Sequence, residues 1–117
     1  MRLNEVRYDD AVPIDGYGPG FFRVGGVVHQ GGVAILPEGL FAWDGYEDLT
    51  VLLEHASEID VLFVGTGPEI SHIPQVMREA LEEAGVGVEV MASPTACRTY
   101  NVLLSEGRRI GAALLTV

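Results

Sequence analysis

From residue 59 to the C-terminus the sequence alternates apolar runs of strand length with segments of helical periodicity, and this order constrains the fold most. The apolar runs are Ile59 to Val64, Val86 to Met91 and Ile110 to Val117. The first run is nearly continuous, as expected of a strand that is covered on both faces. The order strand, helix, strand, helix, strand predicts parallel pairing through right-handed crossover connections.

Two helices are predicted between these strands. Pro74 suits the first turn of a helix that ends at Gly85, and Ser93 suits the N-cap of a helix that begins with Pro94 and ends at Gly107. The apolar face of the first helix comprises Ile73, Val76, Met77, Ala80, Leu81 and Ala84. The second helix directs Ala96, Cys97, Tyr100, Leu103 and Leu104 to the core.

The N-terminal third carries eight glycines between residues 11 and 39 and shows no helical period. Runs of β-branched and aromatic residues lie between these glycines, at Phe21 to Val24, Val27 to His29, Val33 to Leu36 and Leu40 to Trp43. They predict an antiparallel β meander, in which Trp43 is a core side chain. Asp48 or Thr50 offers the N-cap of a short helix that ends near Ser57.

The predicted fold class is therefore α/β, with one domain over residues 1–117. Its mixed central sheet combines the N-terminal β meander with the C-terminal βαβαβ segment, and helices pack against that sheet. About two thirds of the surface of an unfolded chain of this length can be buried, so the fold needs neither a metal nor a disulfide.

Seventeen acidic and seven basic side chains give a formal net charge of −10, and all seven basic residues are arginines. Because a protein that binds phosphate backbones needs a basic face, the charge argues against nucleic acid as a partner. No stretch reaches the roughly 20 apolar residues that span a bilayer, so direct membrane insertion is not expected. The unpaired Cys97 and the N-terminus, which does not resemble a signal sequence, predict a cytoplasmic location.

The strands that end at Gly65 and Met91 both run into loops that open helices. Parallel strands bring such loops to one edge of a sheet, which is where ligands bind in open α/β sheets. Gly65 and Gly67 permit close backbone approach, Thr66 offers a hydroxyl group, and helix N-termini favour anions. The pattern predicts an anion site, although a tight structural turn is the simpler interpretation of this loop.

The segment PTACRTYN, residues 94–101, carries the densest chemistry in the chain. An arginine near the start of a helix opposes the helix dipole, so Arg98 requires either an anionic ligand or an acidic partner such as Glu69 or Glu89. Cys97 and Asn101 share a helix face beside it. We interpret Cys97 as a buried structural thiol, because no histidine is positioned by the sequence to act as its base.

The remaining polar residues give weaker signals. His29, His55 and His72 are isolated from one another in the sequence, so no metal site and no cofactor are expected. Only His72 follows the Gly65–Gly67 loop closely. Arg108 and Arg109 are predicted to cover the last carbonyl groups of the preceding helix.

Four segments occur in the order FRVGG, VAILPEGLFAW, VLFVGTG and GVGVEVMASPTACRTYNVLLSEGRRIGAALL. In these segments, from about residue 16 onward, the chain resembles the Mth-938-like family, a domain of unknown function that includes mitochondrial respiratory complex I assembly factor 3 and an adipogenesis-associated protein. The resemblance implies a three-layer α/β fold. The motif residues that it carries over are Gly65, Thr66, Gly67, Cys97, Arg98, Thr99, Tyr100 and Asn101.

Two hypotheses of function follow. The resemblance implies a non-enzymatic interaction or assembly module, whose protein partner belongs to a respiratory or membrane-associated complex. The alternative is a small-molecule anion-binding protein, or an enzyme, that uses the Gly65–Gly67 loop and Arg98. The apolar strands of the meander would also allow a homodimer.

Overall fold

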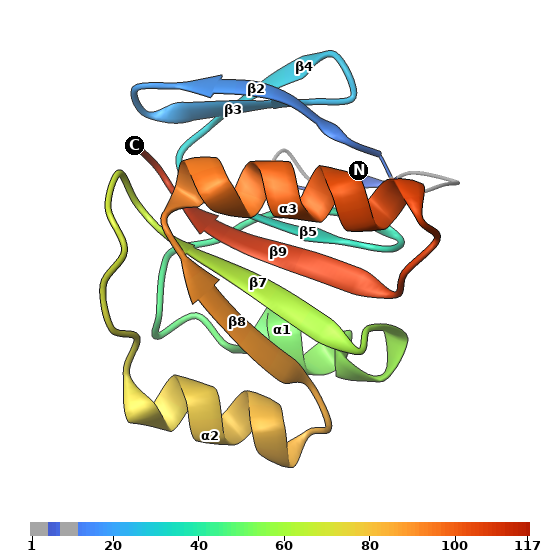
Figure 1. Cartoon of the computed structure of the whole chain (residues 1–117), viewed down its shortest axis with the longest axis vertical. Coiled ribbons are helices and arrows are strands. Elements are labelled where there is room, and N and C mark those ends of the chain that lie inside the picture. The colour runs from blue at the N-terminus through green and yellow to red at the C-terminus, as the bar shows by residue number, and fades with distance from the viewer. Residues whose placement is uncertain (1–4, 8–11) are drawn as a thin grey trace.

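The computed structural model describes residues 5–7 and 12–117, and a six-stranded sheet forms its centre (Figure 1). In spatial order its strands are β1 (Glu5–Arg7), β6 (Gly39–Ala42), β5 (Val33–Leu36), β9 (Ile110–Leu115), β7 (Val61–Thr66) and β8 (Gly87–Met91). Strand β7 is parallel to both of its neighbours, β8 and β9, whereas β1, β6, β5 and β9 pair antiparallel. The predicted mixed central sheet and its parallel segment are thus confirmed.

The meander divides between two sheets, which the sequence pattern did not predict. Strands β2 (Ile14–Gly18), β3 (Phe21–Val24) and β4 (Val27–Gln30) form a separate antiparallel sheet, whereas β5 and β6 join the central one. The division falls at two glycines. Gly31 has a φ of +84°, which L side chains rarely adopt, and a Cβ on Gly32 would lie 2.6 Å from the carbonyl oxygen of Trp43.

Strand β2 was not predicted because two of its five residues are glycines. A side chain at Gly18 would overlap the ring of Phe21, which lies over this position from the next strand. The glycine therefore weakens the strand signal in the sequence while it permits the aromatic packing.

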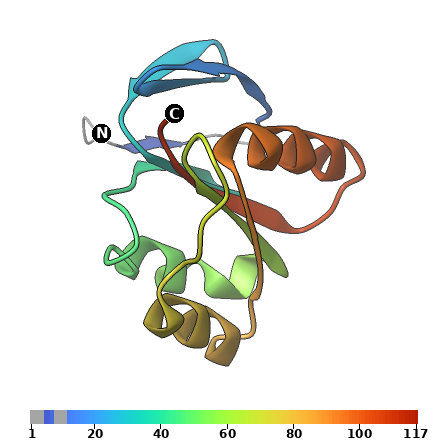
Figure 2. The ribbon, with the colours of Figure 1, turned by 60° about the vertical axis from the view of Figure 1, so that its left-hand side comes forward.

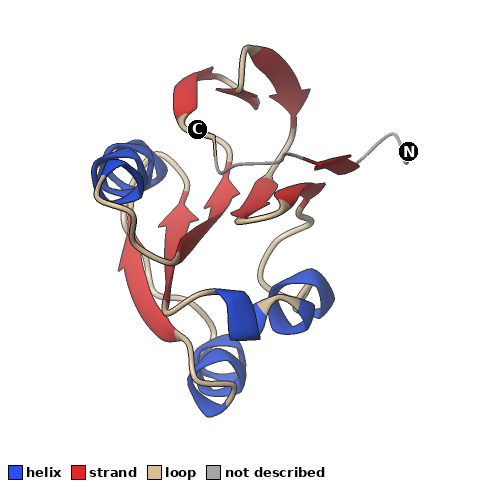
Figure 3. Ribbon diagram, turned by 90° about the vertical axis from the view of Figure 1, so that its right-hand side faces the viewer, coloured by secondary structure: helices blue, strands red, loops and turns tan. Residues whose placement is uncertain are grey.

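The molecule has three layers (Figure 3). Helix α3 (Ser93–Ser105) and the three-stranded sheet cover one face of the central sheet, and the other face carries α1 (Thr50–Glu54), the short 3₁₀ helix η1 (Ala56–Glu58) and α2 (Gln75–Glu83). This confirms the three-layer α/β fold implied by the family resemblance.

Alternating side chains of the central strands build two cores. In β7, Phe63 faces α3, whereas Leu62 and Val64 face α1 and α2. In β5, Ile35 belongs to the core on the α3 side and Leu36 to the core on the α1 and α2 side. Burial on both faces explains why these strands are continuously apolar in the sequence.

Two expectations about the helices were wrong. In α2, Met77 and Leu81 are buried as predicted, but Val76 is 73% exposed and Ala84 also faces solvent. The helix packs at the edge of the sheet, near β8, so only a narrow stripe of its surface is covered.

The second wrong expectation is the N-cap of α1, for which Asp48 or Thr50 was predicted. Helix α1 has no side-chain cap, and instead the carboxylate of Asp48 accepts the N–H of Asp44 at 3.1 Å.

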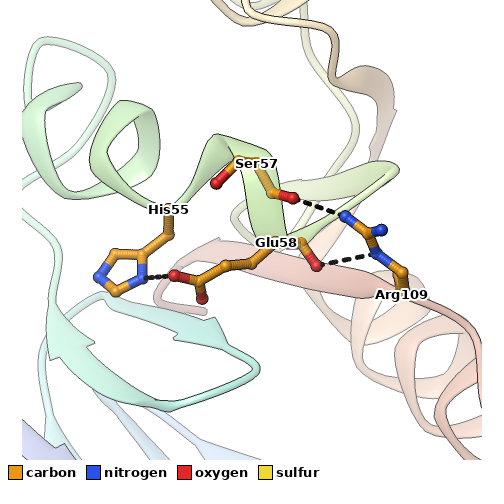
Figure 4. Close-up of polar contacts among 4 residues, drawn as sticks. All are labelled: His55, Ser57, Glu58 and Arg109. Carbon is orange, nitrogen blue, oxygen red and sulfur yellow. Dashed lines mark hydrogen bonds and ion pairs between the residues drawn. The ribbon is translucent and has the colours of Figure 1, made fainter.

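Arg109 stabilises a different helix from the one expected (Figure 4). Its Nη2 donates to the carbonyl oxygen of Ser57 at 2.6 Å and its Nε donates to that of Glu58 at 3.2 Å. The guanidinium therefore covers the last carbonyl groups of η1 rather than those of α3. Glu58 Oε2 lies 2.9 Å from Nδ1 of His55, the residue that precedes η1.

Candidate functional site

The loop after β7 and the start of α3 lie together, held by the hydroxyl group of Ser93. The N–H of Ser93 donates to the carbonyl oxygen of Gly67 at 2.8 Å, and the N–H of Gly67 donates to Ser93 Oγ at 2.9 Å. Ser93 Oγ in turn donates to the carbonyl oxygen of Leu115 at 2.6 Å. Ser93 is fully buried. Its hydrogen bonds join the ends of β7 and β9 to α3, and its hydroxyl group does not act as the predicted N-cap.

The polar groups of the Gly65–Gly67 loop bond within the chain. The hydroxyl of Thr66 donates to the carbonyl oxygen of Glu69 at 2.7 Å and accepts the N–H of Ser71 at 3.1 Å. Gly67 adopts a φ of +102°, and a Cβ on Gly65 would lie 2.6 Å from Ser93 Oγ. The two glycines and the threonine thus form the tight turn that the sequence also allowed.

Three of the motif residues on α3 point into the protein. Asn101 makes a pair of hydrogen bonds with the backbone of Ile14: its Oδ1 accepts the N–H and its Nδ2 donates to the carbonyl oxygen, both at 2.8 Å. Tyr100 is buried, and its hydroxyl donates to the carbonyl oxygen of Val12 at 3.3 Å. These bonds attach the three-stranded sheet to α3.

Cys97 is a buried, free thiol between α3 and the central sheet. Its side chain is 4% exposed, and burial raises the pKa of the thiol to about 11, which the neighbouring charge of Arg98 offsets only in part. Because the thiolate is the nucleophilic form, this environment favours a structural thiol.

Arg98 and Thr99 lie on the solvent side of α3, away from the loop. Arg98 Nη2 is 3.4 Å from Thr95 Oγ1, and within the described residues its guanidinium pairs with no carboxylate. Together with the 58% exposed Val102 and with Leu103, these residues line an open depression of about 270 Å³ that no loop residue borders. We call this region, Arg98, Thr99, Val102 and Leu103, the α3 surface.

The structure therefore groups the eight predicted site residues into an interior set and the α3 surface. Sequence reasoning missed two important positions. Ser93 was considered only as a helix cap, although it lies two residues after the end of β8. Val102 was not considered, although it is an apolar residue on the solvent side of the helix, opposite Tyr100.

The described part of the chain lacks two further features. Residues 5–7 and 12–117 hold no group of three His, Cys, Asp or Glu side chains that could bind a metal ion. The helices in those ranges are too short and too polar to span a bilayer.

The geometry is that of a small three-layer α/β protein in which a strand-end loop and a helix start are joined by the buried hydroxyl group of Ser93. A family profile described as "Protein of unknown function (DUF498/DUF598)" matches residues 14–115. The chain therefore belongs to this family, which confirms the resemblance seen in the sequence.

Two sequence relatives extend this assignment. An uncharacterised protein of Rhodobacter capsulatus is 50% identical over 115 residues, which cover 98% of this chain and 93% of that protein. The human NADH dehydrogenase [ubiquinone] 1 alpha subcomplex assembly factor 3 is 34% identical over 114 residues, or 90% of this chain. The chain spans 61% of the length of the human protein.

Solved structures have the same fold. A crystal structure described as an outer membrane protein from Bartonella henselae superimposes with a TM-score of 0.87 at 34% identity, covering 94% of this chain and 99% of that one. The solution structure of a Mth938-like domain from Bordetella pertussis gives a TM-score of 0.74 at 28% identity, covering 98% and 92%.

Proposed function

We propose that the chain is a non-enzymatic docking module that assists assembly of a membrane-associated respiratory complex, and that the α3 surface is where its protein partner binds. One observation carries the proposal. On the motif helix, Cys97, Tyr100 and Asn101 are engaged inside the protein, whereas Arg98 and Val102 are presented to solvent.

The chemistry of the α3 surface suits a protein. Arginine is enriched where proteins contact one another, and the covered centre of an interface is more apolar than the rest of the protein surface. Arg98 is a cation without a carboxylate partner among the described residues of a chain that carries a net charge of −10. The partner would therefore present a carboxylate next to an apolar side chain, which would pack against Val102.

The name of one relative supports this class of partner. The human relative is named as an assembly factor of NADH dehydrogenase, and the Bartonella structure is described as an outer membrane protein. The proposal follows the first of these two descriptions. We place this activity in the cytoplasm, where a free thiol such as Cys97 stays reduced.

The test replaces the chromosomal gene in the source organism with variants of the α3 surface. Val102→Asp introduces a carboxylate into the apolar part of the α3 surface. Arg98→Glu reverses the charge of the arginine side chain on the same surface. Membranes are then solubilised mildly, and the amount of assembled NADH dehydrogenase is measured by native gel activity staining. Both variants are expected to reduce the assembled enzyme to the level of a deletion strain.

Two matched controls separate docking from folding and from charge. Val76→Asp changes an exposed valine on α2, and Arg108→Glu reverses an exposed arginine outside the α3 surface. Both controls are expected to support normal assembly. Normal assembly in the deletion strain, or equal loss in the controls and the α3 variants, would overturn the proposal.

The alternative, an anion site made by the Gly65–Gly67 loop and Arg98, stays a prediction. The hydroxyl of Thr66 and the N–H of Gly67 already have partners within the chain. The loop therefore has few unbonded polar groups left for an anion, whereas the guanidinium of Arg98 on the α3 surface is exposed to a protein partner.

A further inference from the structure

A second cavity lies on the opposite layer of the molecule, beside β8. It has a volume of about 380 Å³ and sits between the loop that leaves β7, the first turn of α2 and β8. Figure 2 shows this loop running forward and down into α2, with β8 beside it. The lining residues are Ile70, Ser71, His72, Ile73, Gln75, Arg78 and Val90, and we call this cavity the β8 pocket.

The lining of the β8 pocket separates into an apolar part and a cationic part. Ile70, Ile73 and Val90 provide the apolar part, and Ile70 is 67% exposed. Arg78 provides a guanidinium group and His72 an imidazole ring. A pocket of a few hundred Å³ with an apolar lining and a few convergent polar groups is typical of small-molecule sites.

The lining of the β8 pocket is cationic, whereas the chain as a whole is acidic. Acidic residues outnumber basic ones by 17 to 7 in the sequence, yet none of the described residues that line this pocket carries a carboxylate. Arg78 is half-buried, and within the described residues its guanidinium forms no hydrogen bond or ion pair. A partly desolvated guanidinium without an acceptor is a strong anchor for an anionic oxygen.

The first turn of α2 adds to the positive charge at the β8 pocket. Gln75 begins the helix after Pro74, no side chain caps the helix, and its first turn contains no acidic residue. The free N–H groups of the turn leave partial positive charge at this end of the helix. The Gln75 amide is directed elsewhere, because it donates to Glu79 Oε1 at 3.1 Å.

We propose that the β8 pocket binds a small organic anion, a carboxylate or phosphate attached to a short apolar chain. Arg78 and His72 hold the charged group, and Ile70, Ile73 and Val90 contact the apolar chain. This site is separate from the α3 surface, so the two proposals stand or fall independently.

The test is a titration of the isotopically labelled full chain, followed by the amide and side-chain resonances of residues 70–78 and Val90. The probes are hexanoate, hexyl phosphate and the uncharged hexanamide. At least one of the two anions is expected to shift these resonances in a saturable way and to bind at least tenfold more tightly than hexanamide. The tighter of the two anions identifies the preferred charged group.

Matched arginine variants test the anchor. Arg78→Gln is expected to weaken anion binding about tenfold, which is the loss of one charge-assisted hydrogen bond. Arg108→Gln removes the same charge from an exposed position outside both the β8 pocket and the α3 surface, and is expected to leave binding unchanged. His72→Gln serves as a second pocket variant if Arg78→Gln does not fold.

Three results would overturn the proposal. The first is the absence of saturable shifts at the pocket with either anion. The second is equal affinity for hexanamide and the anions, which would indicate apolar contact alone. The third is equal weakening by Arg78→Gln and Arg108→Gln, which would indicate a general charge effect.

Discussion

The hydroxyl of Ser93 joins three segments that are far apart in the sequence, and the residues around it are small for that reason. It accepts the N–H of Gly67 and donates to the carbonyl oxygen of Leu115, and a Cβ on Gly65 would collide with it. Buried backbone groups such as these need partners, because leaving one unpaired costs about 1–3 kcal/mol. The serine is thus part of the fold rather than a ligand group.

This geometry predicts the effect of Ser93→Ala. The variant leaves the N–H of Gly67 buried without a partner, so the free energy of unfolding should fall by about 1–3 kcal/mol in urea titrations. Ser105→Ala is the matched control, since Ser105 is exposed on the same helix and should change stability by less than about 0.5 kcal/mol. Equal stabilities of the two variants would contradict this role.

Cys97 gives a prediction for alkaline pH. Its pKa is raised by burial to about 11 from an ordinary value near 9, so the folded state holds the proton more tightly than the unfolded state. The resulting stability is fully present below pH 9 and is lost as the pH rises toward about 11. A shift of this size corresponds to about 2–3 kcal/mol.

The measurement is the free energy of unfolding between pH 8 and pH 11 for the wild type and for Cys97→Ala. Tyrosines titrate in the same range, so only the difference between the two proteins reports the thiol. The wild type should lose more stability than the variant across this interval. Parallel curves would show that the thiol is not protected by burial.

At the scale of elements, Asn101 makes two of the hydrogen bonds that attach the three-stranded sheet to α3. Asn101 on α3 forms two hydrogen bonds of 2.8 Å with Ile14 on β2, and these join residues 87 positions apart. An amide side chain is needed for this pairing, because one bond requires an acceptor and the other a donor.

We expect Asn101→Ala to loosen the three-stranded sheet preferentially. Amide hydrogen exchange in β2 and β3 should accelerate more than exchange in β7, because local opening no longer breaks the two bonds. Thr99→Ala on the same helix is the control. It should leave the ratio of the exchange rates in β2 and β3 to those in β7 unchanged. Equal acceleration in β2 and β7 would mean that the two sheets open only together.

The elements also show which features the sequence could predict. The continuous apolar run of β7 indicated a strand buried on both faces, and its parallel pairing followed from the order of elements. Periodicity could not indicate that α2 lies at a sheet edge, so Val76 was misplaced. Nor could it indicate that Arg109 bonds to Ser57, because the two lie 52 positions apart.

The candidate site was predicted less completely, for a similar reason. The approach of the Gly65–Gly67 loop to the start of α3 followed from parallel strands. Serine, however, is equally typical of helix caps and of tertiary hydrogen bonds, so sequence alone could not assign the partners of Ser93. The solvent exposure of Arg98 depends on how α3 is rotated against the sheet, which neighbouring elements decide.

At the scale of the whole molecule, the net charge of −10 is distributed over a body of 34 × 29 × 29 Å. The Debye length is about 30 Å at 0.01 M salt and about 10 Å at 0.1 M. At the lower concentration, acidic groups on opposite sides of the molecule therefore repel one another. At the higher concentration only near neighbours do.

Salt should consequently stabilise this protein. Ion pairs are few among the described residues: Arg109 lies 4.0 Å from Asp60 between exposed side chains, and the contact of His55 with Glu58 is ionic only when the imidazole is protonated. Screening such pairs costs little, whereas screening the repulsion of excess carboxylates favours the compact state. The thermal midpoint should rise as sodium chloride increases from about 0.01 M to about 0.2 M and level off beyond that.

A charge variant separates screening from other effects of salt. Glu82→Gln with Glu83→Gln removes two exposed carboxylates from α2, so the double variant should gain less from salt than the wild type. Sodium sulfate at equal ionic strength provides a further comparison, because sulfate also strengthens apolar burial and should raise the midpoint beyond the plateau. A midpoint that falls with sodium chloride would mean that attractive pairs, not excess carboxylates, dominate the electrostatics of the folded chain.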